Sequence, residues 1–102
     1  MHNTRELMEL CAIIEGFLTS LRMGDGMQEE NVEKLCSALR HVAELYRASP
    51  MVPKRLAFYL VELDSQMIVQ ADAYPKPERD RIYKASDRVG ELIRNSVLSF
   101  EK

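Results

Sequence analysis

Residues 56–71 carry more apolar side chains than one face of a helix can hold. Their spacing is helical, and a first apolar stripe runs along one side of the helix that it predicts. That stripe consists of Leu56, Tyr59, Leu60, Leu63, Met67 and Ala71. A second stripe consists of Ala57, Val61 and Ile68, with Phe58 and Val69 beside it. Because a bundle helix normally needs only about three apolar positions in seven, the second stripe requires a further surface to pack against.

The rest of the chain divides into amphipathic segments of similar length, in which apolar residues recur every three or four positions. The breaks between them are marked by Gly24, Gly26, Pro50, Pro53, Pro75 and Pro77. Pro53 and Pro77 are expected to be the first residues of their helices, because a missing N–H costs nothing there. The sequence therefore predicts helices over residues 4–22, 28–47, 53–73 and 77–99.

The length and the composition fit one all-α domain over residues 1–102. Apolar residues make up 46% of the chain and charged residues 29%, which are ordinary values for a globular protein. Helices of about 20 residues are about 30 Å long, and short connections favour antiparallel neighbours. We expect an antiparallel four-helix bundle of the up-down-up-down type. The alternative is a pair of helical hairpins that interlocks with a second copy in a dimer.

Side chains that could carry catalysis or bind a metal are sparse. Neither His2 nor His41 follows a glutamate by three residues, as a carboxylate-bridged metal site in a helical bundle requires. Cys11 and Cys36 fall within apolar stripes, where thiols are usually buried and unreactive. No glycine-rich phosphate loop follows a strand. We therefore expect no metal, no cofactor and no enzymatic activity.

The first helical segment carries two further indications. The apolar run over residues 7–21 is interrupted by Glu9 and Glu15, and it is too short and too charged to cross a bilayer. Together with the absence of a basic leader, this predicts a cytoplasmic protein without membrane contact. Gly16 faces away from the main stripe, near Ala12. It is either a tolerated surface glycine or a point where another backbone approaches closely.

A row of basic side chains in the last segment could contact phosphates. It consists of Arg81, Lys84 and Arg88, and acidic residues are interleaved with it. The chain has a formal net charge of −2, whereas DNA-binding domains usually carry a basic excess. Nucleic acid is therefore not the expected partner. The alternative interpretation is a solvated face, or ion pairs with the acidic first or second helix.

The second stripe of residues 56–71 remains the strongest indication of function. The expected interface has the apolar centre Ala57, Phe58, Val61, Ile68 and Val69, flanked by Glu62, Gln66 and Asp72. A contiguous apolar surface of a few hundred Å² usually marks an interface. The alternative is that neighbouring helices and the proline-rich breaks cover this stripe within a monomer.

These observations favour a small helical adaptor or regulator that masks another protein by stoichiometric binding and forms a homodimer. The expected partners are a second copy of the chain and a different protein. One alternative is a nucleic-acid-associated regulator that uses the basic row. The other is a small-molecule sensor with an adaptable pocket, whose lining would include Met8, Met27, Met51 and Met67.

Overall fold

The computed structural model describes residues 4–98, and all regular secondary structure among them is helical. The elements are α1 (Thr4–Arg22), α2 (Glu29–Leu45), α3 (Lys54–Ala71), α4 (Lys76–Leu92) and the π-helical turn η1 (Ile93–Val97). The four predicted helices are present, and their starts and the first three ends differ from the prediction by at most two residues. The predicted last end, at residue 99, lies outside the described residues; regular α-helix ends at Leu92, and η1 continues it.

The breaks between the helices follow from backbone restrictions. Gly24 and Gly26 both have a φ of 82°, which glycine adopts without strain, and they end α1 and begin the turn into α2. Pro53 is extended and lies one residue before α3, not at its first position as predicted. Pro77 is the second residue of α4, not the first. Both corrections are small, because none of these positions needs an N–H for the helical ladder.

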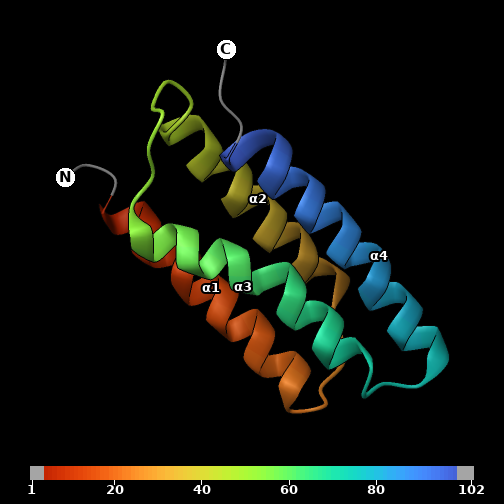
Figure 1. Cartoon of the computed structure of the whole chain (residues 1–102). Coiled ribbons are helices and arrows are strands. Elements are labelled where there is room, and N and C mark those ends of the chain that lie inside the picture. The colour runs from red at the N-terminus through yellow and green to blue at the C-terminus, as the bar shows by residue number, and fades with distance from the viewer. Residues whose placement is uncertain (1–3, 99–102) are drawn as a thin grey trace.

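The four helices alternate in direction along the chain, as Figure 1 shows. Two hairpins, α1–α2 and α3–α4, lie against each other, with α1 beside α3 and α2 beside α4. The consecutive helices α2 and α3 therefore lie across the diagonal of the bundle. The predicted all-α four-helix bundle is confirmed. The two hairpins pack on each other within one chain, so this arrangement needs no interlocked second copy.

The core runs along the centre of the bundle and takes one stripe from every helix. Ile14, Leu35, Leu63 and Ile82, one from each helix in turn, are fully buried. The buried residues of α3 are Leu56, Leu60, Leu63, Met67 and Ala71, which belong to the predicted first stripe. The sixth member, Tyr59, is only half-buried, and its hydroxyl donates a hydrogen bond to Glu15 of α1. The inner side of α3 is therefore fully used by the core.

Candidate protein interface

The outer face of α3 is the side of this helix that points away from the core, and it carries the predicted second stripe. The exposed fractions of its large apolar side chains are 61% for Phe58, 66% for Val61, 45% for Ile68 and 57% for Val69. Ala57 lies at the margin of this face and is half-buried. The alternative in which the bundle covers the second stripe is therefore wrong. α1 and α4 flank α3 and contact its inner side, so they leave the outer face open.

The outer face forms a regular seam along the helix. Phe58, Val61, Ser65, Ile68 and Asp72 follow one another at alternating intervals of three and four residues. This is the spacing of core positions in a coiled coil, which keeps one row of side chains facing a partner helix. Ser65 interrupts the apolar row, but its hydroxyl donates to the backbone carbonyl of Val61 at 3.3 Å. It can therefore be covered without leaving its proton unpaired.

Polar groups border this seam. Glu62 and Gln66 are half-buried, and Asp72 is exposed at the carboxyl end of α3. The hydroxyl of Tyr83 donates a hydrogen bond to the carboxylate of Asp72 at 2.5 Å. The acceptor carboxylate raises the pKa of Tyr83, because it stabilises the protonated phenol. The carboxylate of Asp72 is thus held in place at one end of the seam.

The basic row on α4 has a different environment. Arg88 donates two hydrogen bonds to the carboxylate of Glu33 on α2, at 2.9 and 3.1 Å. Arg81 donates to Glu78 at 2.5 Å and to Glu29 of α2 at 3.5 Å. These contacts lower the pKa of the Glu33 carboxyl and raise the pKa of both guanidinium groups. Lys84 lies between the two arginines and is exposed. Both arginines thus form ion pairs with α2, which is one of the alternatives that the sequence left open for the basic row.

A clasp at one end of the bundle was not predicted from the sequence. Tyr74 donates its hydroxyl proton to the carbonyl of Leu21 at 2.6 Å and accepts the N–H of Gly26 at 3.1 Å. The carboxylate of Glu78 accepts the N–H of Met27 at 2.7 Å. This N–H, and next Arg81, lower the pKa of Glu78. The clasp joins the α1–α2 turn to the start of α4, and no local pattern in the sequence signals a contact across about 50 residues.

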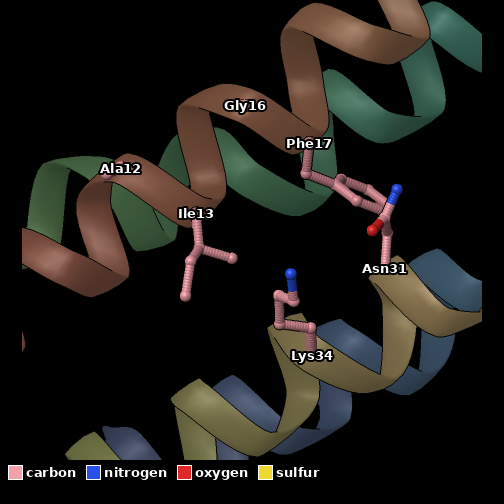
Figure 2. A pocket seen from close by; sticks show the side chains of 6 residues that line it. All are labelled: Ala12, Ile13, Gly16, Phe17, Asn31 and Lys34. Atoms are coloured by element: carbon pink, nitrogen blue, oxygen red, sulfur yellow. The ribbon is translucent and has the colours of Figure 1, made fainter.

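A shallow groove of about 210 Å³ lies between α1 and α2. Figure 2 shows Ile13 and Phe17 of α1 facing Lys34 and Asn31 of α2 across it. Gly16 lines the groove, and apart from its chain neighbours and the adjacent backbone of α1, no described atom lies within 4 Å of the position that a Cβ would take there. Within one subunit, Gly16 is therefore a surface glycine and not a point of close backbone approach.

The four methionines of the sensor hypothesis lie in different environments. Met27 and Met67 are buried in the core, whereas Met8 and Met51 are among the most exposed apolar residues. A groove of about 270 Å³ between α1 and α3 includes only Met8 of the four. The four side chains are therefore divided between the core and the surface of the described structure.

Within residues 4–98, no three His, Cys, Asp or Glu side chains lie close enough together to hold a metal ion. Cys11 and Cys36 are buried free thiols, and burial raises the pKa of both. No helix in this part of the chain is long and apolar enough to cross a membrane.

Comparison with protein-family models, with curated proteins and with solved structures finds no match to this chain.

Proposed function

We propose that this chain is a small helical regulatory protein that acts by stoichiometric protein binding, with the outer face of α3 as its contact surface. The observation that carries the proposal is the exposure of Phe58, Val61, Ile68 and Val69, each between 45% and 66%, on one side of a single helix. The opposite side of that helix is anchored in the core, so the surface is rigid. Rigid apolar surfaces lose little conformational freedom on binding, which favours affinity.

The magnitude of the expected affinity supports a specific complex. Covering the apolar side chains of this face would remove about 300–500 Å² of apolar surface from water, which is worth on the order of 10 kcal/mol before costs. Loss of translational and rotational freedom and the ordering of side chains offset most of this gain. A complex in the micromolar range or tighter is the expected result. The mechanism is occlusion, in which the bundle covers a functional surface of its partner.

The test uses two aspartates placed in the middle of the seam. We expect the double variant Val61→Asp/Ile68→Asp to remain folded, because both side chains are exposed in the free chain, and to lose its protein partners. Ser37→Asp/His41→Asp is the matched control, since it adds the same charge at exposed positions of α2. Tagged wild-type and variant proteins would capture partners from extracts of the source cell. Each captured partner would then be purified and titrated against them by calorimetry.

The proposal requires a stoichiometric complex that the control forms and the seam variant does not. Circular dichroism of both variants separates loss of binding from loss of folding. The proposed surface would be contradicted if a folded Val61→Asp/Ile68→Asp variant captured the same partner as wild type and bound it with equal affinity in calorimetry.

Nucleic-acid binding through the basic row is the alternative function. The pairing of Arg81 and Arg88 with glutamates does not favour it, because a phosphate would have to displace those carboxylates. A filter-binding assay at low salt with wild type and Arg81→Ala/Lys84→Ala/Arg88→Ala distinguishes the two functions. Binding that depends on these side chains and weakens steeply with salt would support the alternative.

A further inference from the structure

The charges at the two ends of α3 are placed against the dipole of the helix. Lys54 and Arg55 occupy its first turn, which contains no acidic residue, and Asp72 follows its last residue. Cations are unfavourable at the positive amino end of a helix, and anions are unfavourable at its negative carboxyl end. Lys54 and Asp72 are also exposed, and both continue the seam of the outer face, at intervals of four residues from Phe58 and Ile68.

We propose that the outer face of α3 binds the same face of a second copy, with the two α3 helices antiparallel and centred on Leu63. This inference rests on the proposed function, since it assigns a partner to the same surface. In an antiparallel pair, each amino end lies beside the carboxyl end of the other helix. Lys54 then lies beside the negative end of the second helix, and Asp72 lies beside the positive end. Charges that oppose their own helix dipole become favourable in the dimer.

The register follows from matching the seam to itself. With Leu63 at the centre, Lys54 lies opposite the second copy's Asp72, and Phe58 lies opposite its Ile68. Val61 lies opposite its Ser65, whose hydroxyl is already bonded to its own backbone. Every position of the seam therefore has a compatible neighbour. Two oppositely charged pairs close the ends of an apolar centre, and the contact is the same from either copy, as a two-fold axis requires.

Other arrangements of the two helices are less favourable. In a parallel pair, Lys54 would face Lys54 and Asp72 would face Asp72. A shift of one heptad in one direction of the antiparallel pair would place Asp72 against Val61 and leave Lys54 beyond the end of the contact. A shift in the other direction would place Lys54 against Ser65 and leave Asp72 beyond the end, so either shift loses both charge pairs. Like charges, or a carboxylate against an apolar side chain, are costly at an interface. The charge pattern therefore selects both the orientation and the register.

The size of the contact indicates a weak dimer. α3 has 18 residues, so the seam is about 27 Å long at 1.5 Å per residue. Two copies that each cover about 300–500 Å² of apolar surface would bury an area at or below the lower end of that of specific protein complexes. The register also brings the two half-buried Glu62 side chains near each other across the axis, which opposes association. A dissociation constant in the micromolar range is expected.

The test measures the dimer dissociation constant of the full chain by sedimentation equilibrium. Lys54→Asp or Asp72→Lys alone should weaken the dimer about tenfold, because each change places like charges at both ends. The double variant Lys54→Asp/Asp72→Lys should restore an affinity close to that of wild type. Both changes improve the match of α3 to its own dipole. Asp72→Lys also removes the acceptor of the Tyr83 hydroxyl, so circular dichroism of each variant is needed to separate weaker association from loss of folding. Glu62→Gln should tighten the dimer.

A cross-link tests the orientation directly. A chain with Val61→Cys and a tagged chain with Ser65→Cys are mixed and oxidised. The proposed register places these two positions side by side, within the distance that a disulfide spans. It predicts a mixed disulfide in excess over either homodimeric one, whereas a parallel pair predicts the reverse.

The outcomes separate this inference from the proposed function. Restoration of affinity by the double charge reversal, together with the mixed disulfide, supports the inference. A dimer that is insensitive to the charge reversals overturns it, although loss of that dimer in Val61→Asp/Ile68→Asp would keep the outer face as a binding surface. A chain that stays monomeric up to about 1 mM also overturns it, because its dimer would then be far weaker than the micromolar dissociation constant that the inference predicts. Capture of a different partner through Val61 and Ile68 would then leave the proposed function intact.

Discussion

The outer face of α3 and the side of the bundle formed by α2 and α4 are both exposed to solvent. Only on the α2–α4 side does the chain itself supply partners for the exposed side chains. On the α2–α4 side, Arg88 is paired with Glu33, and Arg81 is paired with Glu29 and Glu78. On α3, Phe58 and Val61 are more than half exposed and have no comparable cover.

The difference follows from the range of the two kinds of interaction. A long charged side chain on one helix can reach a neighbour, so adjacent helices satisfy each other's charges at their shared edge. Apolar side chains are covered only by direct packing, and in this bundle the neighbours of α3, which are α1 and α4, leave its outer side uncovered. An apolar row on such a side therefore indicates a missing partner more strongly than a charged row does.

The largest expected effect is a dependence of stability on protein concentration. If α3 binds a second copy, the apparent free energy of unfolding rises by about 2.7 kcal/mol when the concentration of free monomer reaches about 100 times the dissociation constant. Thermal unfolding of wild type across a range of concentrations measures this effect. Val61→Asp/Ile68→Asp should abolish it, whereas Arg81→Ala/Arg88→Ala should preserve it. If thermal stability depends equally on protein concentration in both variants, the outer face of α3 does not contribute more to self-association than the α2–α4 side does.

The next largest effect is expected for the clasp, which joins the start of α4 to the α1–α2 turn. Glu78→Ala removes the acceptor of the Met27 N–H and one partner of Arg81. Because Met27 is buried, we expect a loss of about 1–3 kcal/mol in the free energy of unfolding, measured by urea denaturation. Asp87→Ala is the control, since it removes an exposed carboxylate from the same helix and should change stability by less than about 0.5 kcal/mol. Equal losses would show that the clasp does not stabilise the fold.

The same clasp predicts a dependence of stability on pH. The pKa of Glu78 is lower in the folded chain than in the unfolded chain, because the Met27 N–H and Arg81 favour its carboxylate. Its contribution is therefore fully present above the ordinary pKa of a glutamate and is lost as the pH falls through the lowered value. Urea denaturation between neutral and acid pH measures this loss. Glu78→Gln should flatten that part of the profile, and an unchanged profile would contradict the role of the carboxylate.

The smallest effect is expected for the ion pair between Arg88 and Glu33. Both side chains are substantially exposed, so the coupling between Arg88→Ala and Glu33→Ala in a double-mutant cycle should be weak. It should also disappear in 1 M salt, where charges are screened over about 3 Å. A coupling that persists in high salt would show that this pair is shielded from solvent. The α2–α4 side would then contribute more to stability than its exposure suggests.

Much of the local structure was predictable. Helical periodicity identified all four helices, and glycines and prolines located the breaks, because both depend on short-range backbone geometry. Five of the six residues in the first α3 stripe are buried as predicted. The sixth, Tyr59, reaches Glu15 on the edge of α1, and a contact between helices is not visible in the pattern of one helix.

The candidate interface was predicted from the same helical pattern, and the structure adds which neighbouring helices leave it exposed. The second stripe of α3 could be read from residues 56–71 alone, but whether the bundle covered it depended on which helices are neighbours. The sequence left two roles open for the basic row, and only the position of α2 beside α4 brought Glu33 to Arg88. The four methionines of the sensor hypothesis are separated for the same reason, since Met8 and Met51 are exposed whereas Met27 is buried.

By itself, the sequence determined where helices form and which of them has an excess of apolar surface, because both are properties of residues close together along the chain. Only the tertiary structure decided that α2 and α3 lie across the diagonal, that Tyr74 and Glu78 clasp the α1–α2 turn, and that Val61 faces solvent. These contacts join residues far apart in the chain, and their energies depend on packing in space, which local periodicity does not encode.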